Sequence, residues 1–314
     1  MRPVQSKDDR GLRGATYEVL DRRFARLIKT SAKLDLLDAT SRWAEGPAYV
    51  PAGRYLIWSD VPNNRILRWD ESSGHISVFR SPSDNANGNT IDRDGRLLTC
   101  EQLTRRVSRT EHDGSITVIA DRFDGKRFNS PNDVVVASDG AIWFTDPTYG
   151  IDSDYEGRRA ASEIGQSRVY RVDPADGSVR TLGDDFVQPN GIAFSPDERQ
   201  LYVSDTGRSH VENGPAHIRV FDVKAGRLTG GRVFAECPVG MFDGFRLDEV
   251  GNVWTSAGDG VRCYAPDGNV IGLIRVPSPV ANICFGGPAR NRLFICATDA
   301  VYAIYVLTNG LKLV

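Results

Sequence analysis

Short apolar runs recur along the whole chain, each bounded by polar residues or by a turn sequence. Six of them are alike and occupy residues 56–60, 97–101, 142–146, 201–205, 253–256 and 293–297. They are rich in β-branched and aromatic residues, which is typical of strands buried on both faces. Turn dipeptides such as Asp94-Gly95 and Asp139-Gly140 precede them. The pattern predicts an all-β protein.

An oxygen-bearing residue stands eleven to thirteen positions before an aromatic or aliphatic residue of each run. The six are Glu45, Asn87, Asn132, Asn190, Asp243 and Asn282, at intervals of 42, 45, 58, 53 and 39 residues. A strand-rich repeat of this period predicts a six-bladed β-propeller of four-stranded blades. The last unit lacks a fourth strand. Residues 33–39 alternate apolar and polar side chains, so we expect this N-terminal strand to close the ring and remove its free edge.

The repeats fill one domain, residues 33–314, and leave residues 1–32 as an N-terminal extension in which 17–30 is predicted as a short helix. The extension lacks an apolar core, so we predict no signal peptide, and no segment is long enough to span a membrane. Five cysteines without CxxC spacing indicate buried free thiols and a cytoplasmic protein. The net charge of −2, without a basic block, argues against nucleic-acid binding. The oligomeric state stays open between monomer and dimer.

The first strands of all blades line the channel of a propeller and run in the same direction, so the six oxygen-bearing residues should meet at one mouth. Asn-Gly and Asp-Gly are also common turn sequences, and one such position alone would carry little weight. Agreement at equivalent positions favours a metal site instead. Ligands that are all oxygens favour Ca²⁺ or Mg²⁺, with Mn²⁺ as an option. Glu45 and Asp243 would neutralise the charge of a divalent ion, and amides would leave coordination positions open.

Two long loops, 147–167 and 206–216, are predicted to surround the same mouth and to shape a substrate pocket. The connection 121–131 would bring Arg127 and Asn129 close, with Arg127 binding an anionic or hydroxylated substrate. Asn87 is predicted to face the substrate and Asn282 to have a structural role. The chain has no GxSxG sequence and no glycine-rich phosphate loop, which argues against a serine esterase and a nucleotide-binding protein.

Several motifs together resemble the senescence-marker-protein/gluconolactonase (regucalcin-like) family of calcium-dependent six-bladed propellers. They are residues 43–47 (WAEGP), 129–133 (NSPND), 144–147 (FTDP), 189–195 (PNGIAFS) and 243–244 (DG). The resemblance implies that Glu45, Asn132, Asn190 and Asp243 form the metal shell, and that the reaction opens a sugar lactone such as gluconolactone to the aldonic acid. One branch of the family has an arginine two residues before the metal-binding Asn, where this chain has Ser130.

These observations lead to a hypothesis of metal-assisted lactone hydrolysis with a small-molecule substrate. Ca²⁺ is the expected ion, with Zn²⁺, Mg²⁺ or Mn²⁺ as substitutes, and Asp243 is both a ligand and the general base. Asn87, Asn129 and Arg127 are the candidate substrate-binding residues. Two alternatives remain at this point: phosphotriester hydrolysis with Asp243 as the nucleophile, and a non-catalytic binding propeller whose metal is structural.

Overall fold

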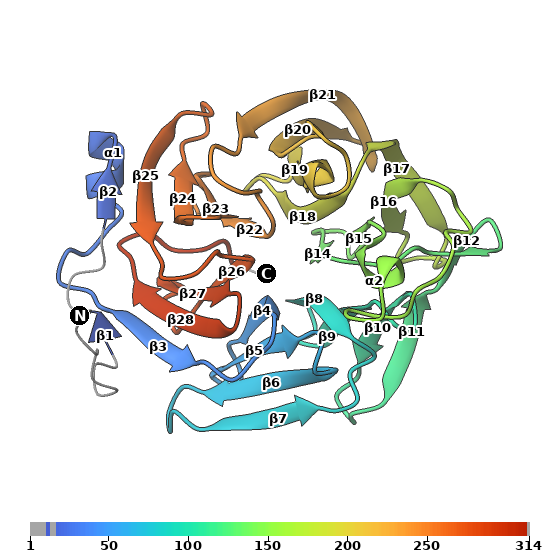
Figure 1. Cartoon of the computed structure of the whole chain (residues 1–314), viewed down its shortest axis with the longest axis horizontal. Helices are drawn as coiled ribbons and strands as arrows, with labels where there is room; N and C mark the ends of the chain where they lie inside the picture. Colours follow the sequence, from blue (N-terminus) through green and yellow to red (C-terminus); the bar gives the residue numbers. More distant parts are fainter. Residues whose placement is uncertain (1–10, 13–16, 313–314) are drawn as a thin grey trace.

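The computed structural model describes residues 11–12 and 17–312, and its strands form six small sheets around one axis (Figure 1). The first three blades consist of β4 (Ala44–Val50), β5 (Tyr55–Asp60), β6 (Arg65–Asp70) and β7 (Ile76–Arg80); β8 (Ala86–Ile91), β9 (Leu97–Glu101), β10 (Arg106–Thr110) and β11 (Ile116–Ala120); and β14 (Val134–Val136), β15 (Ile142–Asp146), β16 (Ser167–Val172) and β17 (Val179–Phe186).

The next three blades complete the ring. They consist of β18 (Pro189–Phe194), β19 (Gln200–Asp205), β20 (His217–Lys224) and β21 (Arg227–Glu236); β22 (Phe245–Leu247), β23 (Val253–Ala257), β24 (Gly260–Tyr264) and β25 (Val270–Arg275); and β26 (Asn282–Gly286), β27 (Arg292–Ala297) and β28 (Ala300–Tyr305). All neighbouring strands within the blades are antiparallel. The prediction of a six-bladed propeller is confirmed.

The sixth blade receives its fourth strand from the N-terminal part of the chain, as the sequence predicts. Strand β3 (Leu34–Asp38) pairs antiparallel with β28, with Leu36 opposite Tyr302. A two-residue strand, β1 (Gly11–Leu12), pairs in turn with β3. The first and last parts of the chain therefore share one sheet, which ties the ring closed.

The segment predicted as a helix over residues 17–30 is a strand followed by a single helical turn. Strand β2 (Tyr17–Val19) adds to the outer edge of β25, and α1 (Arg22–Ala25) follows it. Phe24 of α1 is fully buried and packs on Trp254. The glycine at position 272 leaves room for its ring, since a Cβ added there would lie 2.0 Å from the ring. The rest of the extension, residues 1–10 and 13–16, lies outside the described residues.

The core lies between the blades, where second strands from neighbouring units meet. The tryptophans of these strands, Trp58, Trp143 and Trp254, are 0–2% exposed. All five cysteines are buried and free, which confirms the expectation for the thiols. No helix in the described ranges is long and apolar enough to cross a membrane.

Candidate metal centre and active site

The first strand of every blade lies nearest the axis, and the six predicted residues stand at or just before the starts of these strands (Figure 1). Glu45, Asn87, Asn190 and Asn282 lie within β4, β8, β18 and β26, whereas Asn132 and Asp243 lie two residues before β14 and β22. Five of the six are buried, and Asp243 is partly exposed.

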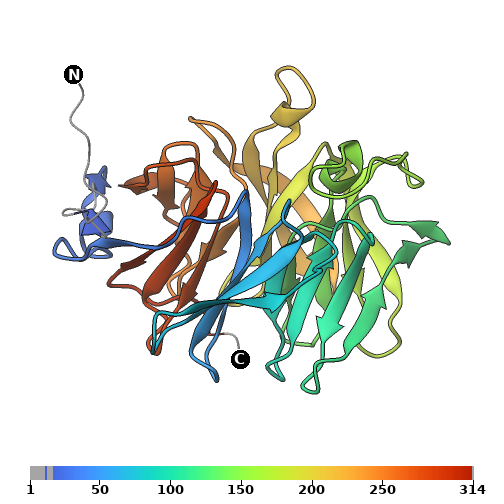
Figure 2. The same ribbon diagram turned by 60° about the horizontal axis from the view of Figure 1, so that its bottom comes forward.

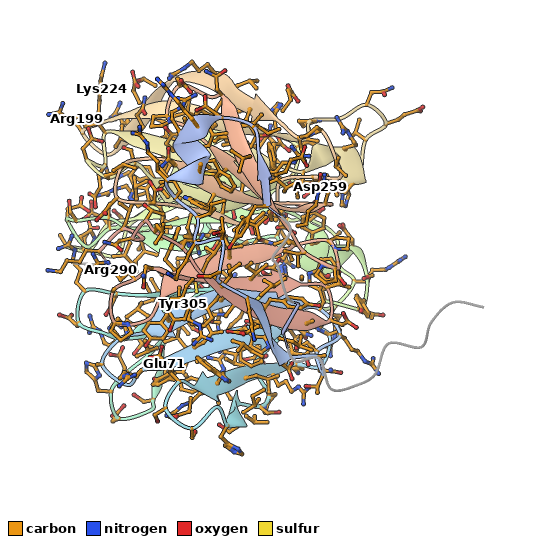
Figure 3. The ribbon with its side chains drawn as sticks, turned by 90° about the vertical axis from the view of Figure 1, so that its left-hand side faces the viewer. Glu71, Arg199, Lys224, Asp259, Arg290 and Tyr305 are labelled. Atoms are coloured by element: carbon orange, nitrogen blue, oxygen red, sulfur yellow. The ribbon has the colours of Figure 1, made fainter. Side chains whose placement is uncertain are left out.

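The long loops surround the same end of the axis. Residues 147–166, here called the α2 loop, carry α2 (Tyr149–Asp152), and residues 206–216, the η1 loop, carry the 3₁₀ turn η1 (Gly207–Ser209). Figure 2 shows both loops, in green and yellow, at one end of the molecule. In the side view of Figure 3, Asp259 lies at the end with the loops, and Arg199 and Arg290 lie at the opposite end.

Glycines after the ring residues let neighbouring blades approach closely. A Cβ would lie 2.0–2.3 Å from the next ring segment at four positions: Gly46 against the Asn87 carbonyl oxygen, Gly88 against that of Asn132, Gly191 against that of Asp243, and Gly244 against the Asn282 side chain. The Asn-Gly and Asp-Gly pairs are therefore not turn sequences here. They are the points at which first strands touch.

Hydroxyl groups hold the backbone at three of the ring positions. Each hydroxyl belongs to the second strand of the blade that precedes the ring residue. Three of them donate to a ring carbonyl: Ser59 to Asn87 at 2.7 Å, Thr145 to Asn190 at 2.6 Å, and Ser204 to Asp243 at 2.8 Å. The register also shifts at the start of three first strands, as between Glu45 and Ala48. Such bulges redirect a side chain away from the normal alternation of a strand.

The two carboxylates of the ring repel each other. Burial and the charges of neighbouring carboxylates, Asp133 and Glu156 among them, raise the pKa of Glu45 to about 7, although Asn282 and Gly46 donate hydrogen bonds to it. Burial and the nearby charge of Glu45 raise the pKa of Asp243 well above its usual value. Two neighbouring acids, one buried and one partly exposed, that oppose ionisation are the arrangement that a divalent cation would relieve.

The asparagines of the ring differ in the hydrogen bonds of their side chains. The side chains of Asn87, Asn132 and Asn190 form no hydrogen bond to any described residue. Asn282 is held by the Ile283 nitrogen at 2.8 Å and donates to Glu45 at 3.0 Å. No group of three or more His, Cys, Asp or Glu residues with metal-ligand geometry occurs in the described part of the chain, so any ion on this axis would depend on amide oxygens as well. The donor set suits a hard cation such as Ca²⁺.

A charged pair in the channel was not predicted from the sequence. Arg246 of β22 donates to Asp133 at 3.1 Å, and Asp133, which follows Asn132, is only 1% exposed. Arg246 also lines a cavity of about 390 Å³, together with Leu311 and residues at the far ends of the first strands. In the sequence, the indication of this pair is one charged residue inside the otherwise apolar first strand 245–247.

Two of the predicted substrate-binding residues, Asn129 and Arg127, form hydrogen bonds with other parts of the protein. Asn129 is fully buried: its amide nitrogen donates to the carbonyls of Asp146 and Gln166, and its oxygen accepts from Ser162 at 2.5 Å. It therefore anchors the base of the α2 loop. Arg127 lies in a hairpin of β12 (Arg122–Phe123) and β13 (Lys126–Arg127) and donates to the Thr104 carbonyl at 2.9 Å. These contacts lend no support to a substrate role for either residue.

The two long loops are joined by hydrogen bonds. The Tyr149 hydroxyl lies 2.6 Å from the Thr206 hydroxyl and 2.9 Å from that of Ser209. His210 contacts Asp152 at 2.7 Å through Nε2 and Ser209 at 2.7 Å through Nδ1. His210 therefore connects the loops around the mouth, and no contact places it on the ring.

Six blades around a ring of carboxylates and amides define a β-propeller with a candidate metal centre on its axis. The profile of the SMP-30/Gluconolactonase/LRE-like region matches residues 43–299, most of the chain. The chain therefore belongs to this family.

Individual relatives agree with this assignment. A gluconolactonase of Zymomonas mobilis is 31% identical over 313 residues, covering 92% of this chain and 85% of its own. A pentonolactonase of Haloferax volcanii is 29% identical and covers 83% of each chain. The solved structure of a gluconolactonase from Xanthomonas campestris is 36% identical, with a TM-score of 0.87 over 97% of this chain and 98% of that one.

Proposed function

We propose that the protein is a metal-dependent lactonase that opens a sugar lactone, such as gluconolactone, to the aldonic acid, with Ca²⁺ held by Glu45, Asn132, Asn190 and Asp243. The observation that carries the proposal is the opposition of two carboxylates, each with a raised pKa, at the end of the axis surrounded by the long loops. Membership in a family with gluconolactonases and a pentonolactonase supports the reaction class.

A bound divalent ion would supply a Lewis acid for the lactone carbonyl and would stabilise the oxyanion of the tetrahedral intermediate. The carboxylate of Glu45 is oriented by two hydrogen-bond donors, the Asn282 amide and the Gly46 nitrogen. The backbone of Asp243 is fixed by Ser256, which accepts from its nitrogen, and by Ser204, which donates to its carbonyl. The side chain of Glu45 and the backbone of Asp243 are thus positioned before any ligand binds, which reduces the cost of organising the site.

Asp243 is the general base of the proposed reaction. Its carboxylate accepts a proton from the attacking water as the new C–O bond forms at the lactone carbonyl carbon. The C–O bond to the ring oxygen then breaks, and Asp243 returns the proton to the departing alkoxide, which leaves a hydroxyl and a carboxylic acid. In the metal-free protein the raised pKa favours the protonated form of Asp243, and a positive charge beside it would favour the ionised form that acts as a base.

The test is turnover of gluconolactone before and after chelation, followed by separate addition of Ca²⁺, Zn²⁺, Mg²⁺ and Mn²⁺. We expect activity to disappear with the chelator and to return with Ca²⁺. Phosphotriesters are assayed in parallel. Turnover that survives complete removal of metal, or turnover confined to phosphotriesters, would overturn the proposal.

A further inference from the structure

Gln102 is a buried amide without partners. It is fully buried, and neither its Oε1 nor its Nε2 forms a hydrogen bond to any described residue. A buried polar group in this state destabilises a fold, because it has lost its bonds to water and gained none in return. Its presence calls for an explanation, such as a ligand that the amide binds.

The position of Gln102 is next to the ring. Its backbone nitrogen donates to the Asn85 carbonyl at 3.2 Å, two residues before Asn87. Gly150 of the α2 loop packs against Gln102: a Cβ added at position 150 would lie 2.6 Å from the Gln102 Cβ and 2.8 Å from the Ser130 Cβ. Ser130 in turn stands two residues before Asn132. Gln102 therefore lies beneath α2, between the segments of the second and third blades that lead to Asn87 and Asn132.

Glu156 is a second polar group without a partner, and it belongs to the same loop. The loop folds back on itself there, since the Arg158 nitrogen donates to the Gly150 carbonyl at 3.0 Å and Gly157 packs on Gly150. The carboxylate of Glu156 forms no hydrogen bond or ion pair with a described residue. Glu156 is half-buried, and its charge contributes to the raised pKa of both Glu45 and Asp243, so it lies within electrostatic range of the ring. Burial raises the pKa of Glu156 itself to about 7.

We propose that Gln102 and Glu156 form a hydroxyl-binding subsite under the α2 loop, which makes the enzyme selective for polyhydroxylated lactones over unsubstituted ones. The inference rests on the proposed lactonase function. An amide offers a donor and an acceptor, and a carboxylate offers acceptors, which together match the paired donor and acceptor character of sugar hydroxyls. A lactone without hydroxyls would leave both groups unpaired, and sites of this kind discriminate strongly against such analogues.

The experiment compares Gln102→Met and Glu156→Gln with the unsubstituted protein on two substrates, glucono-δ-lactone and δ-valerolactone, in the presence of Ca²⁺. We expect kcat/KM for gluconolactone to fall at least about tenfold in each variant, with δ-valerolactone changed by less than about threefold. The Tm of Gln102→Met should stay the same or rise, because the substitution removes an unpaired buried amide.

Thr110→Val is the matched control. The Thr110 hydroxyl is also buried without a partner, but Thr110 ends β10 opposite Leu97, at the end of the blade away from the ring. Its substitution should leave the ratio of the two activities unchanged.

The outcomes separate the two proposals. Wild-type protein that hydrolyses neither lactone with any metal would overturn the lactonase function and this inference with it. Wild-type activity combined with variants that leave the ratio of the two substrates unaltered would overturn the subsite alone. If Gln102→Met does not fold, the decision rests on Glu156→Gln, whose side chain keeps its size and loses only its charge.

Discussion

Asn282 donates a hydrogen bond from its amide nitrogen to Oε2 of Glu45, over 3.0 Å and across 237 residues of sequence. The two residues belong to the sixth and the first blade, so the bond joins the last blade to the first. Because the Ile283 nitrogen donates to the Asn282 oxygen, the amide is oriented with its nitrogen towards Glu45. Asn282 thus orients the carboxylate of a candidate metal ligand.

Asn282→Ala should weaken metal binding about 10- to 100-fold, the usual effect of removing a group that orients a ligand. The kcat at saturating metal should remain close to that of the unsubstituted protein, because no reacting group is lost. Titration of the chelated protein with Ca²⁺ measures the affinity. Asn291→Ala, in a turn at the opposite end of the axis, serves as the control, and equal affinities in the two variants would contradict this role.

Asp243→Asn tests the general base while keeping an oxygen that can bind the metal. Loss of the base should lower kcat by about 10²- to 10⁴-fold on gluconolactone at saturating Ca²⁺. Asp243→Ala should be inactive as well and should also bind the metal more weakly, since it lacks the oxygen. Circular dichroism is expected to show an intact fold in both, and near-normal turnover in either would remove Asp243 from the mechanism.

The repeat makes both the fold and the ring predictable from the sequence. Apolar strands at regular intervals permit few architectures, and equivalent positions of a propeller must converge, as the contact between Glu45 and Asn282 shows. The N-terminal closing strand followed from counting the strands of the last unit. Each of these inferences depends on backbone repetition, which the chain enforces over its whole length.

The remainder of the site depends on loops that do not repeat. Gly150 packs on Gln102, and Gly157, the neighbour of Glu156, packs on Gly150 because the α2 loop folds back there; no periodicity encodes that path. Asn129 was a candidate substrate-binding residue, but its amide binds two carbonyls and a hydroxyl at the base of the loop. Arg246 stands out in an apolar strand, yet its partner Asp133 is 113 residues away. Pairings of this kind follow from three-dimensional packing.

Metal-free protein should become less stable as the pH rises. Glu45 has a folded pKa of about 7 against an ordinary value of 4.5, so the folded state binds more protons than the unfolded chain between these values. Its free energy of unfolding therefore falls as the pH increases through this window, and the raised pKa of Asp243 acts in the same direction. A metal ion replaces these protons, so the stabilisation by Ca²⁺ should grow over the same range.

Thermal melts between pH 5 and 8, with chelator and with Ca²⁺, measure this dependence. Glu45→Gln cannot ionise and should show a smaller loss of Tm with pH in chelator, together with a much weaker response to Ca²⁺. A Tm of the chelated protein that rises steadily from pH 5 to 8 would contradict the coupling between these carboxylates.

Arg246→Met should destabilise the metal-free protein by about 3–5 kcal/mol, because it leaves the buried carboxylate of Asp133 without its counter-charge. The double variant Arg246→Met/Asp133→Asn removes both charges and should recover part of that loss, since the remaining amide can still accept from the Val134 nitrogen, which lies 2.9 Å from Asp133 Oδ1. Urea unfolding in chelator measures both. A double variant less stable than Arg246→Met would mean that Asp133 stabilises the channel through its other contacts and that its charge needs no compensation.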